Sequence, residues 1–211
     1  KVSNTPEPPA AAVAELTLTA MLALARNFVP TNQGVHAGQW PKQIGFSLAG
    51  TAVLIVGYGH IGRRVGALLH ALDAHVLVAD PFLDPSTLTQ GEQLVSLEEG
   101  LSAARVVTLH ASGKKQILGA DELARMQEGA LLLNSARGEL VDEEALIAAL
   151  QSGRLAGVWF DAFWKEPYQG RLLEFPQALL TPHVGTYTVQ CRRDMETQAV
   201  AHLLRDLGVT R

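Results

Sequence analysis

Short apolar runs alternate with helical segments over most of the chain, from residue 51 to residue 181. The runs are continuously apolar, which is typical of strands that are buried on both faces of a parallel sheet. The predicted strands are 51–56, 75–79, 105–109, 130–134, 155–160 and 178–181, and the predicted helices between them lie near 61–72, 97–103, 120–127 and 142–151. This alternation predicts an α/β fold built on a doubly wound parallel sheet.

The two ends of the chain follow other patterns. A helix is predicted from Ala10 to about Asn27, and it is apolar all round, as is typical of a helix buried on more than one side. The preceding TPEPP run at 5–9 predicts an extended segment, and residues 30–47 are predicted to be irregular because glycine and proline recur there. A last helix is predicted near 188–207, with one apolar stripe.

Composition narrows the class of protein. The 211 residues suit one large domain, and a charged fraction of only 18% suggests that a partner covers part of the surface. The 17 Lys and Arg against 21 Asp and Glu argue against nucleic-acid binding. The single cysteine, Cys191, predicts a reducing, cytoplasmic location. We expect no membrane span, because the aliphatic stretch Leu16 to Ala25 is too short, and no metal, because the histidines lack ligand spacing such as HExxH.

A glycine-rich turn, GYGHIG at 57–62, directly follows the strand predicted at 51–56 and opens a helix. In this context Gly57 permits a tight turn, Gly59 lets the backbone approach a pyrophosphate, and Gly62 allows close packing of helix on strand. The diphosphate would lie at the helix N-terminus, where the helix dipole favours anions. Three glycines could also merely form a turn, but their context favours a dinucleotide site of the Rossmann type.

Asp80 ends the next predicted strand, about 20 residues beyond the glycines. A carboxylate at this place accepts hydrogen bonds from the hydroxyls of an adenosine ribose, and its charge repels a ribose phosphate. The sequence therefore predicts NAD rather than NADP as the cofactor.

Candidate chemical groups follow the other predicted strands where each one ends. Ligands of open α/β sheets bind beyond the carboxyl ends of the strands, so these residues should lie near the glycine-rich turn. They are His110 after 105–109, Ser135, Ala136 and Arg137 after 130–134, Asp161 and Glu166 after 155–160, and His183 after 178–181.

Three of these side chains suit hydride transfer between a hydroxy acid and a nicotinamide. Arg137 can hold a carboxylate through two hydrogen bonds and polarise the neighbouring carbonyl. His183 can give a proton to the carbonyl oxygen and take it back, and Glu166 can bond its other ring nitrogen. Each of the three also has a purely structural alternative. His110 is predicted to be mainly structural, bonding backbone near the cofactor.

The ordered motifs resemble the D-isomer-specific 2-hydroxyacid dehydrogenase family over nearly the whole chain. The segments are NTP at 4–6, VAELTL at 13–18, GQW at 38–40, VGYGHIGRRVG at 56–66, ADP at 79–81, TLH at 108–110, NSARGELVDEEAL at 134–146, FDAFWKEP at 160–167 and TPHVGTYT at 181–188. The resemblance implies a catalytic set of Arg137, Glu166 and His183, the same three side chains that stand after the strand ends.

The resemblance also implies how the cofactor is held. Asp161 would face the nicotinamide, His60 and Ile61 would meet the diphosphate, and nearby backbone would line the site. The expected cofactor residues are Gly57, Tyr58, Gly59, His60, Ile61, Gly62, Asp80, His110, Ala111, Ser135, Ala136, Asp161 and Gly185. A homodimer made largely through this domain is implied as well, and it would explain a first helix that is apolar all round.

Two local features depart from the family pattern. The loop after His110, ASGKKQILG at 111–119, is about three residues shorter than is usual, which puts its cofactor contacts in doubt. Thr186 stands where the family commonly has a small residue after the histidine motif. A larger departure concerns domains, because a substrate domain of about a hundred residues precedes the NTP segment in the family. We therefore expect a dinucleotide-binding domain with an N-terminal connecting helix at 1–186, and a C-terminal helix at 187–211 that returns toward a substrate domain absent from this chain.

The leading hypothesis is an NAD-dependent oxidoreductase that transfers a hydride between NAD(H) and a D-2-hydroxy acid or 2-keto acid. D-3-phosphoglycerate dehydrogenase-like and glyoxylate/hydroxypyruvate reductase-like activities are both open. The alternative from another class is an NAD-sensing binding module with little turnover, similar to the transcriptional corepressors that share these motifs. A third possibility is that this piece binds NAD but has no activity of its own.

Overall fold

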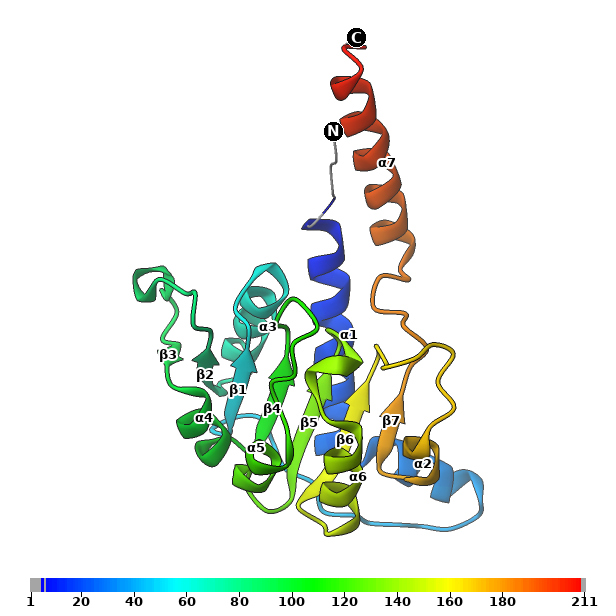
Figure 1. Cartoon of the computed structure of the whole chain (residues 1–211). Helices are drawn as coiled ribbons and strands as arrows, with labels where there is room; N and C mark the ends of the chain where they lie inside the picture. Colours follow the sequence, from blue (N-terminus) through cyan, green and yellow to red (C-terminus); the bar gives the residue numbers. More distant parts are fainter. Residues whose placement is uncertain (1–4, 6, 210–211) are drawn as a thin grey trace.

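The computed structural model describes residue 5 and residues 7–209, and it shows one sheet with helices on both faces (Figure 1). Asn4 and Pro6 of the NTP segment lie outside the described residues. Within the described part, parallel strands pair in the order β3-β2-β1-β4-β5-β6-β7. They are β1 (Ala52–Val56), β2 (His75–Ala79), β3 (Gln93–Leu94), β4 (Val106–Leu109), β5 (Ala130–Asn134), β6 (Leu155–Phe160) and β7 (Ala178–Leu180). The predicted doubly wound sheet is confirmed.

The helices form two layers over this sheet. One layer holds α1 (Glu7–Ala25) and α3 (His60–His70), and the other holds α4 (Leu97–Ala103), α5 (Ala120–Arg125) and α6 (Glu143–Gln151). Neighbouring strand residues alternate between the layers, so Val53 and Ile55 pack beneath α1 and α3 while Leu54 packs beneath α4. The strands are therefore buried on both faces, as their continuous apolar runs predict.

Side-chain caps explain where several helices begin. The Asp142 side chain accepts a hydrogen bond from the Ala145 N–H (2.8 Å) at the start of α6, and Gly153, with φ of 76°, follows its end. Ser96 and Glu99 form a capping box at α4. Three short 3₁₀ turns complete the loops, at η1 (Pro85–Thr87), η2 (Gly138–Leu140) and η3 (Arg171–Glu174).

Two predictions near the N-terminus are wrong, both because of proline. The segment predicted to be extended at 5–9 contributes Glu7, Pro8 and Pro9 to α1. The stretch predicted to be irregular at 30–47 begins inside α2 (Phe28–His36), which has Pro30 in its first turn. Proline is tolerated there because the first N–H groups of a helix have no partner within the helix. The strand β3 was not predicted, since its two residues are exposed and carry no apolar pattern.

The apolar surface of α1 is used mainly inside the domain. By length and composition alone α1 is apolar enough to cross a membrane. In the structure it packs against α3, β5 and β6, and Ala14, Ala20, Met21 and Ala25 are buried. Packing within the domain therefore accounts for most of the apolar surface of α1, and the homodimer stays a prediction.

The last helix, α7 (Val189–Asp206), extends beyond the sheet beside the beginning of α1 (Figure 1). The Thr188 hydroxyl accepts a hydrogen bond from the Cys191 N–H (3.1 Å) and begins the helix one residue after the predicted start. The predicted apolar stripe is exposed at all four of its residues, Val200, Leu203, Leu204 and Leu207. This helix therefore carries an apolar face that the described residues leave uncovered.

Candidate active site

The glycine-rich turn between β1 and α3 has the geometry that each glycine predicts. Gly57 has a φ of 90°, and a Cβ there would lie 2.5 Å from the backbone nitrogen of Ala111. A Cβ on Gly62 would lie 2.3 Å from the Gly57 carbonyl oxygen, so only glycine lets α3 pack so closely. A Cβ on Gly59 would meet nothing within 4 Å. The turn is thus closed on the protein side and open at Gly59, as a pyrophosphate requires.

The start of α3 fits an anionic group. Gly59 is the residue before the helix, and the exposed His60 and partly exposed Ile61 form its first turn. The first N–H groups of a helix have no intrahelical partner, and the helix dipole adds a positive potential there. The predicted diphosphate residues therefore stand where a dinucleotide would be held.

Asp80 connects the end of β2 with the glycine-rich turn. Its Oδ2 accepts a hydrogen bond from the Tyr58 N–H (2.8 Å), and its Oδ1 accepts one from the Phe82 N–H (3.0 Å). These bonds orient the carboxylate and leave further lone pairs for ribose hydroxyls. The Tyr58 side chain, in contrast, turns away from the open side of Gly59, because its hydroxyl lies against Gly66 on α3. Any contact of Tyr58 with the cofactor would thus come from its backbone.

His110 follows β4 and bonds hydroxyl groups rather than the predicted backbone. Its Nε2 lies 2.9 Å from the Thr108 Oγ1, and its Nδ1 lies 3.3 Å from the Ser135 Oγ. Burial of the ring lowers the pKa of His110 from its ordinary value of 6.5 to about 3. The imidazole is therefore neutral at physiological pH and couples the end of β4 to the loop after β5. Its mainly structural role stays a prediction, and the predicted bonds to backbone are corrected to bonds with the two hydroxyls.

The neutral His110 should make the fold sensitive to acid. Between pH 6.5 and about 3 the unfolded chain binds a proton here that the folded chain excludes, so the free energy of unfolding falls as the pH drops through this window. From pH 6.5 to pH 5 we expect a loss of about 2 kcal/mol from this group. Urea unfolding at both pH values, on wild type and His110→Gln, measures it, and the variant should lose less stability. An equal loss in both proteins would contradict the assignment.

The turn that carries Arg137 is clamped by Asn134, the fully buried last residue of β5. The Asn134 Nδ2 donates to the Arg137 carbonyl oxygen (2.8 Å), and its Oδ1 accepts from the Ala136 N–H (3.0 Å). The Arg137 side chain is exposed, and its Nη1 donates to the Ala136 carbonyl oxygen (2.6 Å). Asn134 is a positioning residue that strand-end reasoning missed. A buried asparagine in an otherwise apolar strand was the available signal.

His183 and Glu166 form a pair across two loops. The His183 Nδ1 lies 2.9 Å from the Glu166 Oε2 and 3.0 Å from its Oε1. The bond to His183 is the main cause that lowers the pKa of the Glu166 carboxyl. The Phe163 N–H, which donates to Oε1 (3.1 Å), and the charge of Arg137 lower it further. The structure therefore brings the three predicted catalytic side chains to one edge of the sheet, with Glu166 ionised beside the histidine.

Asp161 holds the loop that presents His183. The carboxylate is 2% exposed and accepts hydrogen bonds from the Thr181 hydroxyl (2.6 Å), the Val184 N–H (2.9 Å) and the Gly185 N–H (2.9 Å). His183 itself has a φ of 54°, which is uncommon outside glycine and is retained only where the surroundings enforce it. Sequence reasoning missed Thr181, which also accepts from the Trp159 indole N–H (3.0 Å). The predicted contact of Asp161 with a nicotinamide remains a prediction, and its observed contacts position the His183 loop.

The short loop 111–119 is tied to the Arg137 turn. The Lys114 Nζ lies 2.8 Å from the Glu139 Oε1, two residues after Arg137. Ala111 at its start lies against Gly57, so the loop borders the glycine-rich turn on one side and the Arg137 turn on the other.

Among residues 7–209, no group of three or more His, Cys, Asp or Glu side chains could hold a metal ion.

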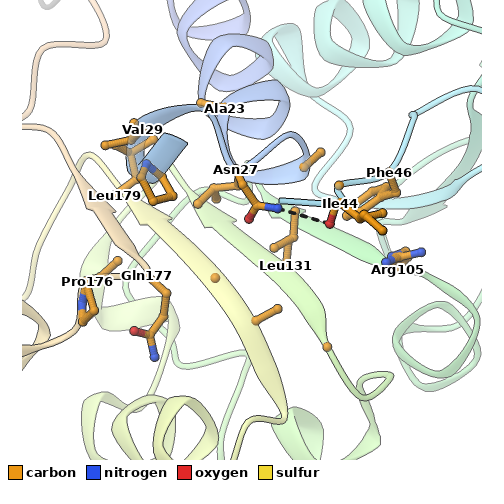
Figure 2. Close-up of a pocket in the computed structure, with 18 residues that line it drawn as sticks. Ala23, Asn27, Val29, Ile44, Phe46, Arg105, Leu131, Pro176, Gln177 and Leu179 are labelled. Carbon is orange, nitrogen blue, oxygen red and sulfur yellow. Dashed lines mark hydrogen bonds between the residues drawn. The ribbon is translucent and has the colours of Figure 1, made fainter. Parts of the chain in front are cut away.

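A hollow of about 260 Å³ lies at the opposite edge of the sheet, before the starts of β4, β5 and β7 (Figure 2). Its walls include Leu24, Ile44, Phe46, Arg105, Gln177 and Leu179. The Arg105 guanidinium lies over the Phe46 ring at 3.9 Å, and Asn27 donates to the Ile44 carbonyl oxygen (3.3 Å). None of the predicted site residues lines this hollow, so it is separate from the candidate active site.

Comparison with known proteins identifies the relatives of this fold and site. Residues 18–185 match the model of the D-isomer specific 2-hydroxyacid dehydrogenase family, NAD binding domain. The chain is 34% identical over 213 residues to the D-3-phosphoglycerate dehydrogenase of Synechocystis sp., and the match covers 98% of this chain and 38% of that protein. The chain spans about half or less of the first curated relatives that it matches, between 38% and 52% of their lengths.

Solved structures resemble the domain closely. A glyoxylate reductase from Paecilomyes thermophila superposes with a TM-score of 0.89 and 32% identity, over 95% of this chain and 63% of that one. An NAD-complexed D-isomer specific 2-hydroxyacid dehydrogenase from Lactobacillus delbrueckii ssp. bulgaricus gives a TM-score of 0.88 and 28% identity, over 100% of this chain and 72% of that one.

Proposed function

The chain belongs to the D-isomer-specific 2-hydroxyacid dehydrogenase family, in its NAD-binding domain, and from this premise we propose that the protein is an NAD-dependent oxidoreductase acting on the CH–OH group of a D-2-hydroxy acid. The observation that carries the proposal is the His183–Glu166 pair beside Arg137, on the sheet edge that also bears the GYGHIG turn. The family assignment confirms the prediction of an NAD-binding domain.

The proposed chemistry follows from these side chains. A bound nicotinamide supplies the hydride in reduction and accepts it in oxidation. In reduction the hydride adds to the carbonyl carbon of a 2-keto acid, and a proton from His183 Nε2 adds to the carbonyl oxygen to form the hydroxyl. Nε2 is the nitrogen available for this step because Nδ1 is bonded to Glu166. The Glu166 carboxylate stabilises the imidazolium, and Arg137 holds the substrate carboxylate.

Turnover by the full-length protein tests the function. NADH oxidation should be measured with hydroxypyruvate, glyoxylate and phosphohydroxypyruvate, because D-3-phosphoglycerate dehydrogenase-like and glyoxylate/hydroxypyruvate reductase-like activities fit the site equally. Turnover of at least one keto acid is expected. No turnover of any of them, together with unimpaired NADH binding, would contradict an enzyme. The alternative of an NAD-sensing, corepressor-like module has no support among the relatives reported above.

Asp80→Ala should weaken NADH binding and reduce discrimination against NADPH by about tenfold, since the carboxylate that would repel a ribose phosphate is gone. Asp80→Asn is the matched variant, because it removes the charge and keeps one acceptor for the Tyr58 or Phe82 N–H. Dissociation constants for both nucleotides, measured by fluorescence titration, give the ratio. An unchanged ratio in both variants would rule out the proposed role of Asp80.

We further propose that two copies pair through this domain. The helix α2 and the segment that follows it carry exposed apolar side chains, since Phe28 is 67% exposed, Trp40 79% and Ile44 95%. Ile44 also borders the hollow in Figure 2, so a partner could fill that hollow and cover the apolar side chains. Sedimentation velocity of the wild type should give a dimer, and Ile44→Asp should shift it toward the monomer. A monomeric wild type would end the proposal.

In the proposed domain organisation, α7 connects the dinucleotide-binding domain with a substrate domain. Its exposed apolar stripe would contact a substrate domain, and residues 1–186 with the connecting helix α1 would form the dinucleotide-binding domain. A cytoplasmic location is proposed from the single cysteine, which is free and buried.

A further inference from the structure

Tyr58, the second residue of the glycine-rich turn, donates two hydrogen bonds, one from its backbone N–H and one from its hydroxyl. The two acceptors lie at the two ends of one loop. Its N–H donates to the Asp80 Oδ2 (2.8 Å), and its hydroxyl donates to the Glu92 Oε1 (2.7 Å). Asp80 directly follows β2, and Glu92 directly precedes β3. The two bonds therefore close the loop 80–92 onto the turn between β1 and α3.

The hydroxyl bond is shielded from water. Tyr58 is 3% exposed, and the Glu92 side chain is 5% exposed. Burial and the Glu92 carboxylate raise the pKa of Tyr58, so the hydroxyl keeps its proton and remains the donor. The Glu92 Oε2 accepts from the Gln90 N–H (2.8 Å), and the His70 Nε2 lies 3.9 Å from Oε1. A carboxylate buried this deeply depends on its donors, because an unpaired buried charge is costly.

Neighbouring residues are arranged around the same bond. A Cβ on Gly66 of α3 would lie 2.5 Å from the Tyr58 hydroxyl, so glycine leaves the room that the hydroxyl occupies. The Arg63 guanidinium lies 5.1 Å from the centre of the Tyr58 ring, and it donates to the Thr87 carbonyl oxygen (3.2 Å) and Oγ1 (2.9 Å). Thr87 lies in the middle of the loop, so α3 holds the loop there as well.

We propose that Tyr58 and Glu92 are positioning residues that hold the loop 80–92 in place and thereby set the affinity for the adenosine half of the nucleotide. The inference rests on the proposed function, because Asp80 at the start of this loop is the residue expected to bond the ribose. Between β2 and β3 the loop has only the short turn η1 as regular structure. Without the bond at Glu92 the nucleotide has to order the loop when it binds, which lowers affinity.

Tyr58→Phe in the full-length protein tests the proposal, because it removes the hydroxyl and keeps the ring. Hydrogen exchange of the amides at 81–92, without nucleotide, should become about tenfold faster. The dissociation constant of NADH should rise about fivefold. Glu92→Gln keeps an acceptor for the hydroxyl and should retain most of the affinity, whereas Glu92→Ala should not.

Tyr168→Phe is the matched control. The Tyr168 hydroxyl donates to the Glu143 Oε1 (2.6 Å) at the start of α6, on the side of the sheet far from β2 and β3. The Tyr168 hydroxyl also accepts from the Leu172 N–H (3.1 Å). Tyr168→Phe therefore removes the same kind of bond to a glutamate and this second bond, and it should leave NADH affinity unchanged. Wild-type exchange and wild-type affinity in Tyr58→Phe would overturn the inference. A wild type that binds no NADH would instead overturn the proposed function and the role in nucleotide affinity, and the exchange data would still report whether Tyr58 holds the loop.

Discussion

Replacing His183 with alanine is expected to lower kcat for keto-acid reduction by about 10²–10⁴-fold, with NADH binding close to wild type. His183 is the side chain that can deliver a proton at Nε2 while its Nδ1 is held by Glu166 at 2.9 Å. Steady-state kinetics with the best keto acid, together with NADH titration, separate the loss of chemistry from a loss of binding.

Glu166→Gln tests the contribution of the second residue of the His183–Glu166 pair. Glutamine can still accept a hydrogen bond from Nδ1, but it carries no charge to stabilise the imidazolium, so a smaller loss of kcat than in His183→Ala is expected. A His183→Ala variant with wild-type kcat would contradict the assigned roles. So would a Glu166→Gln variant whose kcat is lower than that of His183→Ala. Circular dichroism of both variants checks that the fold is retained.

Arg137→Lys is expected to lower kcat/KM for the keto acid by about 10²–10³-fold and to change NADH affinity little. An ammonium group cannot reproduce the two parallel hydrogen bonds that a guanidinium gives to a carboxylate. The exposed Arg137 side chain stands on a turn held by Asn134, so substitution removes the side chain and leaves the turn in place. Equal losses in substrate use and NADH binding would argue against a substrate role.

Asn134→Ala gives a control for that interpretation. It removes the bonds to the Arg137 carbonyl oxygen and the Ala136 N–H and leaves the guanidinium present but less well placed. Its kcat/KM should fall less than that of Arg137→Lys, and its thermal stability should fall more, because a buried clamp is lost.

The order and type of most elements follow from local pattern. Continuously apolar runs predict β1, β4 and β5, and the glycine spacing predicts the turn after β1. Besides the short strand β3, the pattern missed α2 and the first residues of α1. Both contain prolines, and the effect of a proline depends on where the helix begins. The local sequence does not show where the helix begins, and this decides the effect of a proline, because proline is excluded from a helix interior and accepted in the first turn.

Sequence by itself determined the doubly wound fold, the glycine-rich turn and the residues at the strand ends, because the periodicity of side chains and the sterics of glycine act over a few neighbouring residues. Only the tertiary structure decided how the site is held. The bonds from His183 to Glu166, from Gly185 to Asp161 and from Tyr58 to Glu92 join residues 17, 24 and 34 positions apart. Such contacts exist only after the fold has brought these distant segments together, so that each carboxylate accepts from the donors placed beside it.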